Sequence, residues 1–428
     1  VQVEAADLRH GQIKITNRYD FLSLDHLQAS WSVTSEGRVI GGGVIPGLGL
    51  KPGESRIVTV PVDLDRVTGS DGWLNVRFTL AADTAWAKAG FEVAWAQLEL
   101  PVARKPAVPV SLSGCRPLEV RETSDELVIG GDAFRLIWDK RSGRLQEWTH
   151  LGRSLLCRGP RLNLWRAPID NDLWAQEHWK EIPSIVEWKQ YGLHWMQHRL
   201  DGFGHVLADD GLSAEIRVVT RVAPPVLPWG IRTTYRYTLY ASGDLFVRVR
   251  GEIQGTPPAT FPRIGLRLEI PGAYDRVTWY GRGPGESYAD SREANPVGLW
   301  KKTVDELHTP YVHPQENGNR HDVRWVSFAD RAGHGFVVIG QPTLDFGASF
   351  FTPENLEQAR HTCDLVRQAF ITVHLDHRQH GLGSSSCGPD VLEPYRLKSG
   401  DFEFALRLKP FSDRFDSPFE LARQTFGR

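Results

Sequence analysis

Alternation of apolar and polar residues along short segments constrains the fold of this chain more than any other feature. Successive side chains of a strand point to opposite faces, so a period of two predicts half-buried β-strands. The pattern runs through residues 56–64, 73–82, 94–102, 212–223 and 245–254. Residues 231–253 predict a long β-hairpin with its turn at Ser242-Gly243-Asp244.

Helical periodicity is confined to two short segments. Residues 352–360 predict a helix with Thr352 as N-cap and Pro353 at its first position, and residues 417–426 predict a second. The 41 Gly and 27 Pro residues punctuate the strands between them. Together these features predict an all-β protein built from antiparallel sandwiches.

A proline-rich break divides the chain. Residues 104–117 interrupt the alternation and read as a linker between domains. We place the boundary after residue 107. Residues 1–107 then have the size and strand content of an immunoglobulin-like β-sandwich. Residues 108–428 contain no comparable break and predict one large antiparallel sandwich.

Charge and cysteine content exclude several classes of protein. Lys and Arg total 50 and Asp and Glu total 52, which argues against a nucleic-acid partner. No apolar run reaches the length of a membrane span, so no membrane partner is expected. The cysteines, which form no CxxC pair, predict neither a zinc site nor a disulfide framework but reduced thiols of the cytoplasm; they are Cys115, Cys157, Cys363 and Cys387.

The beginning of the chain predicts a fragment or processed piece. The first twelve residues contain neither a basic n-region nor an apolar h-region, so no signal peptide is recognised, and there is no initiator Met.

Candidate functional residues gather in four polar segments that follow strand-like stretches. The first is RAPIDND, which places Arg166, Asp170, Asn171 and Asp172 within seven residues. A buried, salt-bridged turn explains the same residues, so either role is open. Because an unpaired Arg beside Trp165 would be costly, we expect Arg166 to pair with Asp170 or Asp172.

The second and third segments are WYGRGPGESYADS (residues 279–291) and TPYVHPQENGNRHD (residues 309–322). The second lacks the glycine spacing and following helix of a dinucleotide site. Both segments also fit structural loops around prolines. Their candidate binding residues are Glu286, His313, Glu316 and Asn317.

The fourth segment, HLDHRQHGLGSSSCGPD (residues 374–390), contains three histidines. Spacing of three residues in a strand places them on alternating faces, so we expect core or solvated histidines and no metal site. The candidate residues here are His380, Ser386 and Cys387, the last two in an exposed loop tip.

These four segments, in this order and spacing, resemble the C-terminal region of family 2 β-galactosidases. Residues 15–33 and 84–100 resemble the immunoglobulin-like domain that follows the catalytic barrel in those enzymes. The resemblance covers essentially the whole chain. It implies that residues 108–428 form a galactose-mutarotase-like supersandwich whose loop at 381–390 reaches the rim of the active site. Cys387 stands there in place of an aromatic platform, and we do not expect it to be a nucleophile.

The resemblance also implies what lies outside this chain. Retaining glycosidases use two carboxyl groups about 5 to 5.5 Å apart, and in this family both belong to a (β/α)8 barrel. No alternating β-α pattern is present, so we expect no catalytic residue and no cofactor here; the intact enzymes often use Mg and Na bound mainly by the barrel. Expected partners are the barrel and N-terminal domains, a β-galactoside such as lactose, and further copies in a homo-oligomer.

Two alternatives remain open from the residues alone. One is a free-standing carbohydrate-binding module. The other is a mutarotase-like sugar epimerase, for which Glu286, Glu316, His313 and His380 supply the required acid and base types. A bacterial cytoplasmic location is expected in the leading interpretation.

Overall fold

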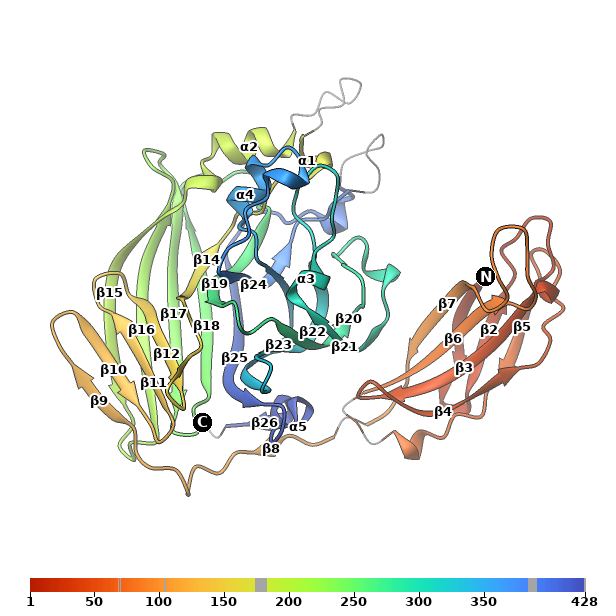
Figure 1. Ribbon diagram of the computed structural model, residues 1–428, viewed down its shortest axis with the longest axis horizontal. Coiled ribbons are helices and arrows are strands. Elements are labelled where there is room, and N and C mark those ends of the chain that lie inside the picture. Colours follow the sequence, from red (N-terminus) through yellow and green to blue (C-terminus); the bar gives the residue numbers. More distant parts are fainter. Residues whose placement is uncertain (68, 70, 104, 174–182, 384–390, 427–428) are drawn as a thin grey trace. The chain divides into compact units, whose positions relative to one another are not determined.

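The computed structural model describes residues 1–67, 69, 71–103, 105–173, 183–383 and 391–426. The chain divides into two compact units, of which the smaller comprises residues 1–109, 297–299 and 419–428 and the larger residues 110–296 and 300–418. Assignment of residues 1–107 and 108–428 to two named folds stays a prediction. The strand content confirms the all-β class (Figure 1).

The smaller unit contains a three-stranded and a four-stranded antiparallel sheet. The first is formed by β1 (Gln2–Asp7), β2 (Gln12–Thr16) and β5 (Ser55–Thr59); the second by β4 (Arg38–Ile45), β3 (Leu27–Ser35), β6 (Gly72–Leu80) and β7 (Glu92–Glu99). Buried and less buried residues alternate along β6, as the sequence predicted. The predicted strand 56–64 ends early, at Thr59, just before Pro61, which has no N–H to donate.

The larger unit is built around a long antiparallel sheet, which has twelve strands among the described residues (Figure 1). Its main path is β14 (Arg158–Asn163), β19 (Arg263–Pro271), β24 (Phe370–Gln379), β23 (His334–Ser349), β25 (Phe402–Ser412), β18 (Leu245–Gln254), β17 (Gly230–Tyr240), β16 (Ser213–Ala223) and β15 (Gln197–Leu207). β20 (Arg276–Arg282), β21 (Val297–Thr303) and β22 (Arg320–Ala329) branch from β23.

A second sheet packs on this one and encloses the core. Its strands are β13 (Arg153–Ser154), β12 (Arg144–His150), β11 (Phe134–Asp139), β10 (Glu126–Gly130) and β9 (Glu119–Glu122). Trp138 of β11 meets Tyr237 of β17 edge-on, with ring centroids 5.7 Å apart. Among the tryptophans that the structure describes, six are fully buried: Trp138, Trp148, Trp188, Trp229, Trp279 and Trp325.

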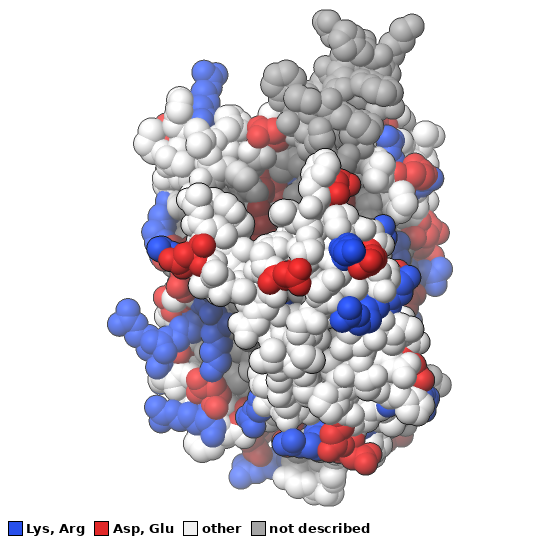
Figure 2. Space-filling model, turned by 90° about the vertical axis from the view of Figure 1, so that its right-hand side faces the viewer, with Lys and Arg blue, Asp and Glu red and all other residues white. Residues whose placement is uncertain are grey.

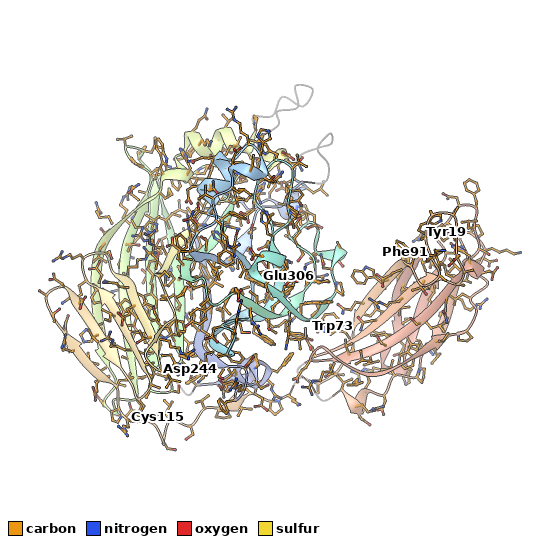
Figure 3. All side chains as sticks on the ribbon, in the orientation of Figure 1. Tyr19, Trp73, Phe91, Cys115, Asp244 and Glu306 are labelled. Atoms are coloured by element: carbon orange, nitrogen blue, oxygen red, sulfur yellow. The ribbon has the colours of Figure 1, made fainter. Side chains whose placement is uncertain are left out.

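The predicted hairpin is confirmed by β17 and β18, which pair around Ser242-Gly243-Asp244. Gly243 has φ +81, a left-handed conformation that favours glycine. Asp244 (labelled in Figure 3) is fully buried and accepts hydrogen bonds from Arg407 Nε at 2.7 Å and Lys409 Nζ at 2.8 Å. The turn is thereby fastened to the neighbouring strand β25.

The helices are short. They are α1 (Asp170–Leu173), α2 (Ser184–Gln190), α3 (Val304–Leu307), α4 (Pro353–Gln358) and α5 (Pro418–Arg423). The two predicted helices correspond to α4 and α5, and Thr352 caps α4 by accepting the Asn355 N–H at 3.2 Å. Within the described residues, no helix combines the length and apolarity needed to span a membrane.

Basic and acidic side chains are interspersed on the face shown in Figure 2, with wide uncharged areas between them. This distribution agrees with the near balance of 50 basic and 52 acidic residues. Three cysteines, Cys115, Cys157 and Cys363, are free thiols, and Cys387 lies outside the described residues.

Candidate functional site

The first polar segment folds back on itself around a buried ion pair. Arg166 has no exposed surface, and its Nη2 donates to both carboxylate oxygens of Asp172, at 3.0 and 3.1 Å. Asp172 Oδ2 also accepts the Ile169 N–H at 3.0 Å, which closes the turn into α1. Pairing of Arg166 with Asp172, one of its two predicted partners, is therefore confirmed. Arg166 Nη1 reaches the fourth segment by donating to the His380 carbonyl at 2.7 Å.

Two neighbouring residues at the start of α1 connect it to different segments. The Asp170 N–H donates to Gln315 Oε1 and Gln315 Nε2 donates to Asp170 Oδ2, each at 3.1 Å. The next side chain, Asn171, donates from Nδ2 to the Leu382 carbonyl at 2.8 Å. Residues 166–172, 315–318 and 380–383 therefore lie together.

The second segment joins the same assembly from the other side. Glu286 accepts the Gly318 N–H at 2.8 Å and also accepts the Tyr311 hydroxyl. Burial, together with that carboxylate, raises the pKa of Tyr311. Asp290 Oδ2 accepts the Gly383 N–H at 2.9 Å. We call residues 166–172, 286–290, 315–318 and 380–383 the loop cluster.

A buried polar network lies next to the loop cluster. Arg263 of β19, with no exposed surface, donates from Nη2 to Glu316 at 2.8 Å and lies 3.3 Å from Asp376. Gln379 Nε2 donates to Asp376 at 3.1 Å and to Asn319 at 2.7 Å. Burial raises the pKa of Asp376 above its usual range, against the opposing effect of Arg263. The network thus holds Glu316 through its ion pair with Arg263. Arg263 was not among the residues predicted from the sequence.

A family comparison decides the relationship of this chain to known proteins. The sequence model of the family described as β-galactosidase small chain matches residues 130–408, and that of β-galactosidase domain 4 matches residues 13–101. The chain belongs to the β-galactosidase small-chain family.

Curated relatives of this small-chain family member are longer proteins. The β-galactosidase of Kluyveromyces lactis is 32% identical over 409 residues, which are 94% of this chain and 36% of the relative. The β-galactosidase of Priestia megaterium is 31% identical, over 90% of this chain and 36% of the relative. The chain thus spans little more than a third of the length of these relatives.

Solved structures superpose only loosely on this small-chain family member. A galactose mutarotase related enzyme from Lactobacillus acidophilus covers 67% of this chain, with 97% of its own length, at 8% identity and a TM-score of 0.36.

The remaining predicted site residues differ in burial and in their hydrogen bonds. His313 is exposed, whereas Asn317 stabilises its own turn by accepting the Thr309 N–H at 2.9 Å. His380 is buried and accepts the Leu397 N–H on Nδ1 at 3.1 Å. Burial, with the neighbouring Arg166 and Arg396, lowers the pKa of His380 to about 3. Ser386 and Cys387 lie outside the described residues.

Burial separates the predicted residues by what they can do. Arg166, Asp172, Glu316 and His380 are each at most 7% exposed and bonded to protein partners. Direct contact of these four with a sugar stays a prediction, and their burial favours a role in holding the loops. The outer residues of the cluster include Asp170, which is exposed, and Asn171, Glu286 and Asp290, which are half-buried.

The outer residues offer hydrogen-bond acceptors suited to hydroxyl groups. Glu316 and His380, two of the proposed epimerase groups, are engaged inside the protein and thus poorly placed to act across a sugar ring. Among the described residues, no group of three or more His, Cys, Asp or Glu side chains could hold a metal ion. Gln315, which joins α1 to the third segment, is a functional candidate that the sequence did not single out.

Proposed function

We propose that this chain is the C-terminal, non-catalytic part of an enzyme that hydrolyses terminal β-D-galactosides with retention of configuration. In this proposal a barrel domain supplies both catalytic carboxyl groups and any bound Mg or Na. Membership in the small-chain family and coverage of about 36% of the β-galactosidase relatives support this division of labour. The partners are the barrel and N-terminal domains, a β-galactoside such as lactose, and further copies of the assembled enzyme, in the cytoplasm.

We further propose that the loop cluster completes the rim of the active site. Convergence is the observation that carries this proposal: four segments from distant parts of the sequence are hydrogen-bonded to one another through Asp170, Asn171, Glu286 and Asp290. Buried Arg166 and Arg263 hold two of these segments from within. A rim of this kind needs fixed positions, since small displacements of substrate-positioning groups reduce turnover.

The first test compares the chain alone with the completed enzyme. The purified chain should not hydrolyse o-nitrophenyl β-galactoside, whereas the enzyme completed with a family barrel portion should. Turnover by the chain alone that survives repurification would contradict the proposal.

The second test concerns the rim. Asp170→Asn in the completed enzyme should raise KM about threefold to tenfold, because one charged hydrogen-bond acceptor for the substrate is lost. A tenfold change in KM corresponds to about 1.4 kcal/mol of binding free energy. Asp209→Asn, at an exposed turn residue with the same change of charge, is the matched control and should leave KM unchanged. Equal effects of the two variants would argue against the rim.

A further inference from the structure

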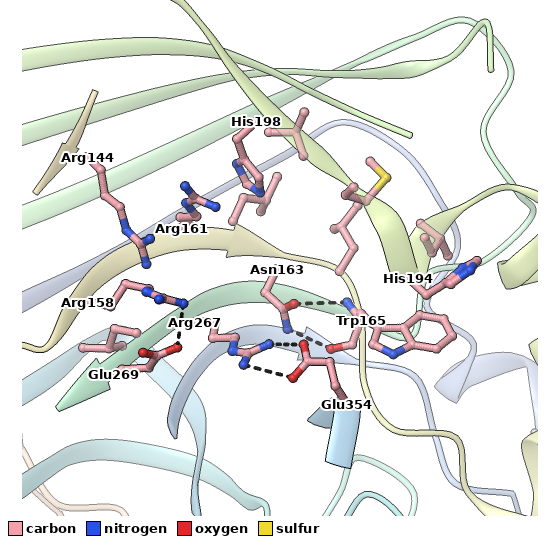
Figure 4. A pocket seen from close by; sticks show the side chains of 16 residues that line it. Arg144, Arg158, Arg161, Asn163, Trp165, His194, His198, Arg267, Glu269 and Glu354 are labelled. Atoms are coloured by element: carbon pink, nitrogen blue, oxygen red, sulfur yellow. Dashed lines mark hydrogen bonds and ion pairs between the residues drawn. The ribbon is translucent and has the colours of Figure 1, made fainter. Parts of the chain in front are cut away.

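A cavity of about 420 Å³ lies in the larger unit and is lined in part by Trp165, the residue that precedes the loop cluster (Figure 4). Its walls come from β12, β14, β15, β16 and β19, together with α4 and the turn before β15. The charged and imidazole side chains that line it are Arg144, Arg158, Arg161, Arg267, Glu269, Glu354, His194 and His198. The other lining residues that matter here are Asn163 and Trp165. We call it the arginine pocket.

Two of the four arginines are neutralised by the two carboxylates of the pocket. Arg158 lies 3.3 Å from Glu269, and Arg267 donates to both carboxylate oxygens of Glu354. The side chains of the other two pair with no carboxylate of the described residues: Arg144 donates to the Gly159 carbonyl at 3.0 and 2.7 Å. The Arg161 side chain forms no hydrogen bond or ion pair with any residue that the structure describes.

This arrangement costs the fold stability. Arg161 and Arg267 lie directly opposite each other on the paired strands β14 and β19, and like charges in that position repel. Burial, with Arg161 and Arg158 nearby, lowers the pKa of Arg144 to about 9. The guanidinium is still charged at neutral pH. Burial, with Arg161 and Arg144, also lowers the pKa of His198 to about 3, so that its ring is neutral.

A dianion would relieve this repulsion. We propose that the arginine pocket binds a phosphate monoester carried on a small hydroxyl-bearing body such as a sugar. Arg144 and Arg161 take the phosphate, since planar guanidinium groups match its oxygens in pairs. The sugar body lies on the other side in this proposal, next to Asn163, which is bonded to the Trp165 backbone, and Glu354, which is held by Arg267 (Figure 4). The cavity volume is within the range of small-molecule sites.

A second arginine-rich surface of the larger unit provides the control. It lies on β16, β17, β18 and β25, and its charged residues are Arg217, Arg232, Arg236, Arg248, Arg250, Glu252 and Glu403. Most of these arginines have an acidic partner, including Arg236, which lies 3.8 Å from Glu215. Removal of one charge here changes the net charge of the protein as much as removal of Arg161.

The experiment is calorimetric titration of the chain with glucose 6-phosphate, inorganic phosphate and glucose at constant ionic strength. We expect glucose 6-phosphate to bind at least tenfold more tightly than inorganic phosphate and glucose not to bind. Arg161→Gln should weaken glucose 6-phosphate binding about tenfold or more, since one charge-assisted pair is lost. The affinity of Arg161→Lys for glucose 6-phosphate should lie between those of Arg161→Gln and the unmodified chain. The affinity of Arg236→Gln should stay within about twofold of that of the unmodified chain.

Thermal unfolding of each variant checks that it is folded, and Arg158→Gln serves as a second pocket variant. Equal affinities for glucose 6-phosphate and inorganic phosphate would overturn the sugar-bearing part of the proposal. Equal losses in Arg161→Gln and Arg236→Gln, or no binding of either phosphate, would overturn the site itself. These outcomes are independent of β-galactoside hydrolysis, so failure here leaves the proposed function untouched.

Discussion

The loop cluster and the arginine pocket both depend on arginine, yet they use it in opposite ways. Arg166 and Arg263 have no exposed surface, and they pair with one and two carboxylates respectively. In the pocket, arginines outnumber carboxylates four to two, and Arg161 is exposed. Buried and neutralised arginines hold chain segments together, whereas unpaired arginines in an open cavity leave charge available to a ligand. The difference between the two regions is therefore one of pairing rather than of composition.

The largest expected effect breaks the paired region. Arg263→Leu leaves Glu316 and Asp376 buried without their cation, and we expect a loss of about 3 to 5 kcal/mol in the free energy of unfolding. Arg161→Leu, the matched change in the pocket, should cost less than about 0.5 kcal/mol or even stabilise. Denaturant unfolding measures both. Equal losses in the free energy of unfolding for the two variants would contradict the distinction between paired and unpaired arginines.

A pH experiment separates the regions next. His380 and His198 are held neutral in the folded protein, with pKa values lowered to about 3, whereas the unfolded chain protonates near its ordinary value. Below about pH 6.5 the unfolded state therefore binds more protons than the folded state. The free energy of unfolding thus decreases as the pH is lowered, by up to about 2 kcal/mol per histidine at pH 5.

Gln variants at the two positions test this expectation. His380→Gln and His198→Gln should each flatten the pH dependence of the free energy of unfolding between pH 7 and 5. With glucose 6-phosphate bound, protonated His198 gains an anionic neighbour, so only the His198 contribution should shrink. An unchanged slope in both variants would show that neither histidine governs acid stability.

Asp172→Asn should have a smaller effect than Arg263→Leu. The uncharged amide keeps one acceptor but loses the ion pair with buried Arg166, for a cost of about 1 to 3 kcal/mol. Asp170→Asn, two residues away and exposed, should cost less than about 0.5 kcal/mol. Thermal unfolding ranks the two, and the reverse order would contradict the buried pair as the anchor of α1.

The smallest effect concerns Asn317→Ala. Its side chain accepts the Thr309 N–H and donates to the Gln315 carbonyl, so the loss should be about 1 kcal/mol. If the loop cluster forms a rim, KM for an aryl β-galactoside in the completed enzyme should rise in addition to this loss of stability. An unchanged KM alongside the full stability loss would make Asn317 purely structural.

The local structure of the chain could largely be predicted from its sequence. Alternation located β6, β7, β16 and β18, and the Thr352-Pro353 pair located the start of α4. These features depend on neighbours in sequence, because side-chain direction and capping are local properties. The helix α2 was not predicted, since its Pro183 N-cap forms no side-chain hydrogen bond and its seven residues are too few for a clear period.

The concentration of polar residues in short segments of the sequence indicated the loop cluster but not the arginine pocket. The polar groups of RAPIDND are adjacent in the chain, so their importance is visible without a fold. The pocket arginines are separated by up to 123 residues, from Arg144 to Arg267, and each one alone looks like an ordinary exposed strand residue. Only the pairing of β14 with β19 brings Arg161 opposite Arg267.

By itself, therefore, the sequence determined the all-β class, the positions of most strands and turns, and the polar segments that converge. Tertiary structure decided the order of the strands, the burial that makes Arg166 and Arg263 structural, and the unpaired charge of Arg161. The physical reason is that burial and charge pairing depend on residues far apart in the chain, and the same guanidinium is an anchor or a ligand group according to what surrounds it.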